Sequence, residues 1–121
     1  MSVVHKFTGN THDFGWQGVD ESPLTEEGLR SVTKHVLIGE IEGAPNSIMR
    51  YFRVEPAGHS RLERHPQEHE VIVLHGKGQV QISDQVHALG PFDVVFVQGD
   101  ELHQFNNTSD EPFGFICVIP K

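Results

Sequence analysis

The segment Glu63-Arg-His65-Pro-Gln-Glu-His69-Glu-Val-Ile-Val-Leu-His-Gly76 gathers acidic and imidazole side chains ahead of an apolar run, and His103 follows later in the chain. Successive side chains of a strand point to opposite faces, so Glu63 and His65 are expected to face one cavity. His69 opens the next strand after a short turn that contains a proline. Imidazole nitrogens and carboxylate oxygens suit a divalent first-row metal ion. The segment therefore predicts a metal site within a strand-rich fold.

The chain has nine histidines, and the six outside this constellation share no spacing that would gather them. Isolated histidines commonly serve as surface groups, strand-edge hydrogen-bonders or satisfied core groups. We therefore expect these six to bind no metal: His5, His12, His35, His59, His75 and His87. The alternative is a metal-free barrel in which every histidine only packs.

Length and charge restrict the class of protein. The chain has 121 residues, with 17 acidic against 9 basic side chains and a formal net charge of −8. This length predicts one domain with a single modest core. Because no basic run is present to follow a phosphate backbone, nucleic acid is not an expected partner. Arg50, Arg53 and Arg61 are expected to pair with surface acids, the alternative being a hold on a substrate carboxylate.

The location is predicted from the cysteine count and the apolar runs. Cys117 is the one cysteine, so no internal disulfide is expected, and the first residues lack the apolar core of a signal peptide. We therefore expect a cytoplasmic protein. Runs such as Val71–Leu74 fall far short of the roughly 20 residues of a membrane span, so no membrane partner is expected.

The spacing of turn-forming residues along the chain predicts an all-β fold. Short β-branched and aromatic runs alternate with Gly, Pro, Asn and Asp at the spacing of a sandwich or barrel. Only Pro23–Leu29, which contains Thr-Glu-Glu, resembles a helical turn. The predicted strands are Val3–Phe7, Thr33–Ile38, Ser47–Val54, Arg61–His65, His69–His75, Gln79–Ser83, Gln85–Leu89, Phe92–Val97, His103–Asn107 and Phe113–Ile119.

The first quarter of the chain differs from the rest. Residues 1–31 are predicted to form an N-terminal arm and residues 32–121 the barrel. Gly9–Ser22 is polar and Gly-rich, with Phe14 and Trp16 as its only large apolar groups. These two side chains are expected to pack against the barrel or a partner subunit, and a mobile flap over the site is the alternative.

From about Val32 to its end, the chain resembles a small single-domain cupin of the cupin type-2 conserved barrel family. The first cupin motif has the form His-x-His, three or four residues, Glu, six residues, Gly. His65 matches its second histidine and Gly76 its glycine, whereas His69 occupies the usual glutamate position and Glu63 the first histidine position. The segment His-Pro-Gln-Glu-His-Glu is similar to a subgroup that carries histidine at that glutamate position.

The second cupin motif ends in Pro-x-Gly-x-x-His-x-x-x-Asn. His103 and Asn107 match its histidine and asparagine, while Gln98 and Asp100 replace its proline and glycine. The resemblance implies a jelly-roll β-barrel that holds one divalent transition metal per chain, with manganese, iron, nickel, copper and zinc all in use among cupins. It also favours Phe115 and Cys117 as residues that line the cavity, and it implies a homodimer.

The expected ligands are Glu63, His65, His69 and His103, the alternative being that Glu63 hydrogen-bonds elsewhere and only the three histidines bind. Four protein ligands on a six-coordinate ion leave two positions for a substrate or dioxygen. We therefore expect a metal-dependent enzyme that acts on a small oxygen-rich or anionic molecule, an oxygenase of the dioxygenase type being one candidate. A non-enzymatic metal-dependent module that binds a small molecule is the alternative, because cupins include both.

Overall fold

The computed structural model describes residues 1–11 and 13–121, so the expectation for His12 lies outside the described residues. These residues form nine β-strands and no helix, which confirms the all-β prediction. No helix suited to crossing a membrane occurs in this part of the chain. The strands are β1 Glu21–Leu24, β2 Arg30–Ile38, β3 Ser47–His59, β4 His69–His75, β5 Gly78–Ile82, β6 Gln85–Leu89, β7 Val94–Val97, β8 His103–Asn106 and β9 Phe113–Pro120.

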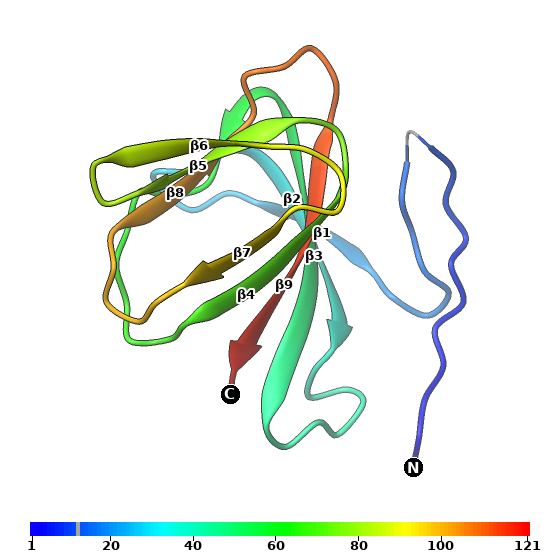
Figure 1. Ribbon diagram of the computed structural model, residues 1–121. Coiled ribbons are helices and arrows are strands. Elements are labelled where there is room, and N and C mark those ends of the chain that lie inside the picture. The colour runs from blue at the N-terminus through cyan, green and yellow to red at the C-terminus, as the bar shows by residue number, and fades with distance from the viewer. Residues whose placement is uncertain (12) are drawn as a thin grey trace.

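The strands form one curled antiparallel sheet in the order β6-β5-β8-β3-β9-β4-β7, with β2 paired to β3 and β1 paired to the free edge of β2. Figure 1 shows this sheet curled into a jelly-roll barrel, with the N-terminal segment along its outside. The long strand β3 pairs with β2, β9 and β8 along its length. It therefore brings segments that lie far apart in the sequence to one barrel wall.

The alternation of side chains along β3 divides the barrel into two faces. Arg50, Phe52 and Val54 line the interior. Tyr51 lies between them on the outer face, yet it is fully buried. Apolar side chains from the other strands complete the interior, with Val73, Val80, Val97 and Phe113 among the most deeply buried. The barrel interior is thus an apolar core except where charged and imidazole side chains enter it.

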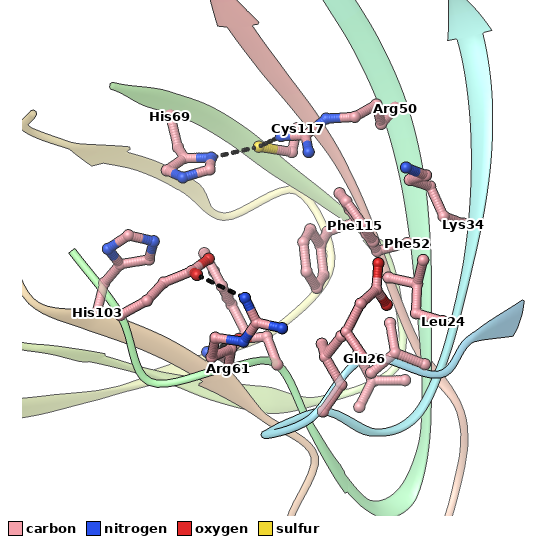
Figure 2. Close-up of a pocket in the computed structure, with 16 residues that line it drawn as sticks. Leu24, Glu26, Lys34, Arg50, Phe52, Arg61, His69, His103, Phe115 and Cys117 are labelled. Atoms are coloured by element: carbon pink, nitrogen blue, oxygen red, sulfur yellow. Dashed lines mark hydrogen bonds and ion pairs between the residues drawn. The ribbon is translucent and has the colours of Figure 1, made fainter. Parts of the chain in front are cut away.

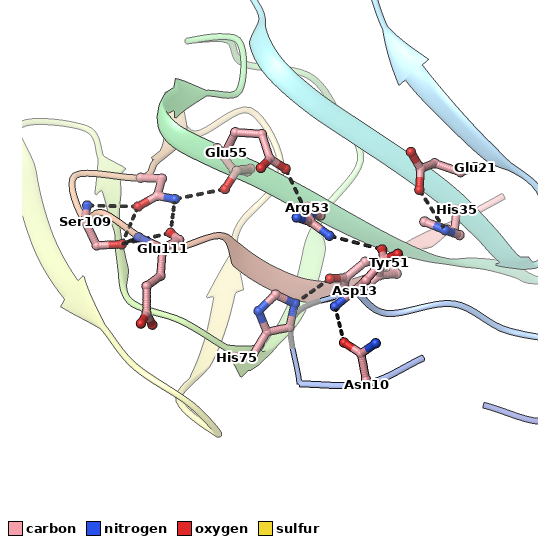
Figure 3. A network of polar contacts seen from close by, with 12 residues as sticks. Asn10, Asp13, Glu21, His35, Tyr51, Arg53, Glu55, His75, Ser109 and Glu111 are labelled. Carbon is pink, nitrogen blue, oxygen red and sulfur yellow. Dashed lines mark hydrogen bonds and ion pairs between the residues drawn. The ribbon is translucent and has the colours of Figure 1, made fainter. Parts of the chain in front are cut away.

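The N-terminal segment covers the outer face of β3. Phe14 stacks on Tyr51 with ring centroids 5.8 Å apart, and Trp16 contacts the same ring at 5.1 Å. The Tyr51 hydroxyl is hydrogen-bonded to His75 Nε2, and Arg53 forms an ion pair with Asp13 (Figure 3). Burial raises the pKa of Tyr51 well above its usual value, so the hydroxyl stays protonated. Aromatic and polar contacts together attach this segment to the barrel.

A single glycine sets the end of β4. Gly76 has φ of +74°, and a Cβ atom at this position would clash with the carbonyl oxygen of Pro112. Glycine therefore allows both the positive φ and the close approach of Pro112, at the position where the first cupin motif also ends in glycine.

Three sequence predictions of local structure are wrong. Val3–Phe7 is not a strand, because only Phe7 finds a bridge partner, Trp16. Arg61–His65 is reduced to one bridge between Glu63 and His103. The Phe105 amide here donates to the Ser60 side chain at 2.8 Å, and this contact replaces a regular ladder bond.

The predicted helical turn is the third error. The first residues of Pro23–Leu29 belong to β1, which pairs with β2, and a turn follows at Glu27 and Gly28. Pro23 lies opposite Thr33 in this pair. A proline is tolerated there because β1 is an edge strand, where no further neighbour requires its missing N–H group.

Candidate metal centre

Three histidines from separate parts of the chain converge at one end of the barrel interior. His69 begins β4, His103 begins β8, and His65 lies in the connection that precedes β4. One ligand atom from each lies within 4.8 Å of the others, and this is the one such group among residues 1–11 and 13–121. Nε2 of His65 and Nε2 of His69 are 2.9 Å apart. Two nitrogens bound at right angles to one ion, at about 2.0–2.1 Å each, would be separated by about 3 Å.

Backbone pairing holds this arrangement together. Glu63 and His103 exchange both backbone hydrogen bonds, at 3.1 and 2.9 Å. The Asp100 amide donates to the His65 carbonyl at 2.7 Å, which ties the loop before β8 to the connection before β4. The sequence-distant His103 is therefore placed beside the Glu63–His65 segment by main-chain contacts.

The far nitrogens of two rings have partners that orient them. Nδ1 of His103 lies 2.8 Å from the carbonyl oxygen of Glu101, which can only accept, so Nδ1 carries the proton and Nε2 keeps its lone pair. Nδ1 of His69 lies 2.9 Å from Sγ of Cys117. Metal-binding histidines use such contacts to fix the ring and its tautomer.

The electrostatics favour neutral imidazoles. Burial, and then the neighbouring His103, His65 and Arg50, lower the pKa of His69 to about 3. A neutral ring has the free lone pair that a metal ligand needs. Nδ1 of His65 is buried without a hydrogen-bond partner. The donor set and its protonation therefore fit a divalent transition metal.

Glu63 lies at the edge of this group. Its carboxylate is 3.7 Å from Nε2 of His65 and 3.7 Å from the guanidinium of Arg61, and its side chain is 37% exposed. The carboxylate thus faces the histidines from the side on which Arg61 holds it. This position is compatible with either role considered for Glu63, direct coordination or a hydrogen bond.

Two of the three histidines, His69 and His103, line a pocket of about 220 Å³ (Figure 2). Phe115 and Cys117 of β9 form part of its wall, together with Phe52 and Phe105. Charged groups enter from several elements. The full lining is Leu24, Glu26, Leu29, Val32, Lys34, Arg50, Phe52, Val54, Ser60, Arg61, Glu63, His69, His103, Phe105, Phe115 and Cys117.

The arginines behave differently from one another. Arg53 pairs with Asp13 and Glu55, and Arg61 pairs with Glu63, as surface pairing predicts. Arg50 instead enters the pocket and donates from Nη2 to Sγ of Cys117 at 3.2 Å. The sequence analysis missed this placement. The available signal was that Arg50 lies two residues before Phe52 and therefore shares its strand face.

The described bystander histidines lie outside the cluster. His35 and His75 contact Tyr51 on the outer face of the barrel, and burial lowers the pKa of both. His5 is hydrogen-bonded to Glu42, a contact that raises its pKa. These rings have structural partners of their own.

The curled sheet and its histidine cluster define a small β-barrel protein of the cupin class. The cupin domain family model matches residues 50–119. The chain therefore belongs to the cupin family, as its motifs indicate.

Relatives agree with this assignment. The chain is 40% identical over 109 residues to the 1-methylthio-D-xylulose 5-phosphate methylsulfurylase of Rhodospirillum rubrum, covering 88% of this chain and 69% of the relative. A crystal structure of a cupin-2 domain protein from Rhodospirillum rubrum superposes with a TM-score of 0.83 at 38% identity, covering 94% of this chain and 77% of that one. A cupin 2 conserved barrel domain protein from Rhodopseudomonas palustris gives 0.87 at 26% identity, covering 98% and 80%.

Proposed function

We propose that this chain is a metal-dependent enzyme that acts on a small, oxygen-rich anionic molecule. The observation that carries the proposal is the convergence of three imidazoles, two of which line a pocket. His65, His69 and His103 are the proposed ligands, and Glu63 is the proposed fourth. A divalent ion held by these residues would supply Lewis-acid stabilisation of an oxygen anion on the substrate.

The surrounding residues have distinct parts in this proposal. The Glu101 carbonyl orients His103, and the Cys117 sulfur orients His69. Phe52 and Phe115, whose rings lie 5.6 Å apart, form an apolar wall that limits water in the pocket. Interactions with a bound anion are strengthened where water is excluded.

For the specific reaction, we propose transfer of the methylthio group of a 1-methylthio sugar phosphate to a thiol co-substrate. The carbon–sulfur bond of the sugar breaks, a disulfide forms between the thiol sulfur and the methylthio sulfur, and the proton of the thiol ends on the sugar carbon. The support is the 40% identity to the methylsulfurylase, which extends over 88% of this chain. The histidines of the pocket would hold a metal ion that binds oxygens of the sugar. The cationic side chains of the pocket would bind its anionic group. The proposed reaction is therefore cleavage of a carbon–sulfur bond, in place of the oxygenation that the sequence suggested.

Metal content tests the proposed ligands. We expect His65→Ala, His69→Ala and His103→Ala each to lose most of the metal, because each removes one directed bond. His87→Ala is the matched control, since His87 is exposed and lies on β6, outside the cluster. Metal would be measured by mass spectrometry on protein prepared without a histidine tag. Full occupancy in His103→Ala would overturn the assignment.

Turnover tests the reaction. The metal-loaded protein would be incubated with 1-methylthio-D-xylulose 5-phosphate, with and without an added thiol as acceptor for the methylthio group. We expect the methylthio signal of the sugar to disappear in proton NMR without oxygen uptake. Oxygen consumption tied to substrate loss would support an oxygenase instead. Binding without either change would support the non-enzymatic module.

A further inference from the structure

We propose that Arg50 and Lys34 form a subsite that receives the phosphate group of the substrate. The inference rests on the proposed function, because it takes a sugar phosphate as the substrate and the histidine cluster as the reacting end of the pocket. Both side chains line that pocket, and both come from strands that form one wall of it (Figure 2).

Arg50 has hydrogen-bonding capacity that the described protein does not use. Its guanidinium lies over the Phe52 ring at 4.8 Å, and Nη2 donates to Sγ of Cys117. Its Nε is buried without a hydrogen-bond partner. A buried donor without a partner is costly, and an arginine presents five donors in a fixed fork. This fork is therefore held in place with donors available to a ligand.

Lys34 brings a second positive charge to the same face. It lies opposite Phe52 in the pairing of β2 with β3, whereas Val36 lies opposite Arg50. Lys34 and Arg50 are thus diagonal neighbours on one sheet face, a separation that long side chains can span. Two cations so placed repel each other, and an anion between them relieves the repulsion.

The two cations lack an ion-pair partner among the described residues. Neither Arg50 nor Lys34 forms an ion pair with any carboxylate in residues 1–11 and 13–121. Glu26 lines the same pocket without pairing to either cation. Arg61, the other arginine of the pocket, is already paired with Glu63. Arg50 and Lys34 are therefore the two cations of the pocket without an ion-pair partner among the described residues.

The subsite lies close to the histidine cluster. Sγ of Cys117 contacts both Nδ1 of His69 at 2.9 Å and Nη2 of Arg50 at 3.2 Å. A small molecule could therefore direct its oxygens to the histidines and its anionic group to the cations. A phosphate monoester fits better than a carboxylate, because it offers three acceptor oxygens and up to two charges to an arginine fork and an ammonium together.

Calorimetric titration of the full chain tests this subsite, in metal-free and manganese-loaded forms. The probes are D-xylulose 5-phosphate, unphosphorylated D-xylulose, and gluconate as a carboxylate. We expect Arg50→Met to weaken binding of D-xylulose 5-phosphate by about 10- to 100-fold and Lys34→Met by less. Arg53→Met removes the same charge on the outer face and is expected to change binding less than about two-fold. Lys34→Met and Arg50→Lys continue the test if Arg50→Met does not fold.

The outcomes separate the two proposals. Phosphate-selective binding that Arg50 and Lys34 variants weaken supports the subsite even if no metal binds and no turnover occurs. Wild-type protein that fails to bind D-xylulose 5-phosphate in both forms overturns it. So does equal binding of the unphosphorylated sugar, tighter binding of gluconate, or wild-type affinity in Lys34→Met and the folded Arg50 variant.

Discussion

Acid is expected to destabilise the metal-free protein through His69. Burial, and then the neighbouring His103, His65 and Arg50, hold the folded-state pKa of His69 at about 3, against 6.5 for an unperturbed histidine. Because the folded-state pKa is depressed, the unfolded chain binds more protons between these values, and the free energy of unfolding falls as the pH drops below 6.5. Each pH unit removes up to about 1.4 kcal/mol, or about 2 kcal/mol at pH 5. The ring is only partly enclosed, so we expect about 1–2 kcal/mol.

Urea unfolding in the presence of a chelator, at pH 7 and pH 5, measures this effect. The loss of stability between the two pH values should be smaller in His69→Gln than in the wild type by that amount. His35 and His75 also have lowered pKa values, and they contribute equally to both proteins. His5→Gln is a control of opposite sign, because Glu42 raises the pKa of His5 and its stabilisation is present in acid. An identical loss in wild type and His69→Gln would refute the reasoning.

Three further predictions concern the fourth ligand, the outer face and assembly. Glu63→Gln should weaken metal affinity while Glu63→His retains it, as measured by competition with a chromogenic chelator; a loaded structure with the carboxylate beyond about 3 Å of the ion would exclude coordination. Tyr51→Phe should lower the free energy of unfolding by about 1 kcal/mol in urea titrations, because it removes the hydrogen bond to His75. We expect a homodimer, since the edge strand β7 exposes Val94 and Phe96; light scattering that returns 13.6 kDa at micromolar concentrations would reject it.

Strands whose own residues have a strong β preference were predictable from the sequence. β4 and β9 carry dense runs of β-branched and aromatic residues, and the structure places both as strands within a residue of their predicted bounds. β1 carries no such signal, because Glu-Ser-Pro-Leu favours no strand by composition. Its strand conformation comes from pairing with β2, a contact between segments that the local pattern does not encode.

The candidate site was only partly visible for a similar reason. His65 and His69 are close in the sequence, and the second cupin motif adds His103. The contacts of Cys117 with His69 and Arg50 join β9 to β4 and β3, and they follow from sheet order rather than from spacing. Arg50 was expected to pair with the many surface acids, and its place inside the barrel follows from the pairing of β3 with β2 and β9.

The two faces of β3 have separate roles, so they can be changed independently in protein engineering. Substitutions at Arg50 and Phe52 alter what the pocket contacts, whereas substitutions at Tyr51 and Arg53 alter how the N-terminal segment is attached. A library that varies only the even positions from 50 to 54 would therefore explore new ligands with the attachment intact. A library that varies the odd positions would change the attachment and leave the composition of the pocket wall untouched. The ligand selectivity of the pocket and the attachment of the N-terminal segment can thus be changed separately, at alternate residues of one strand.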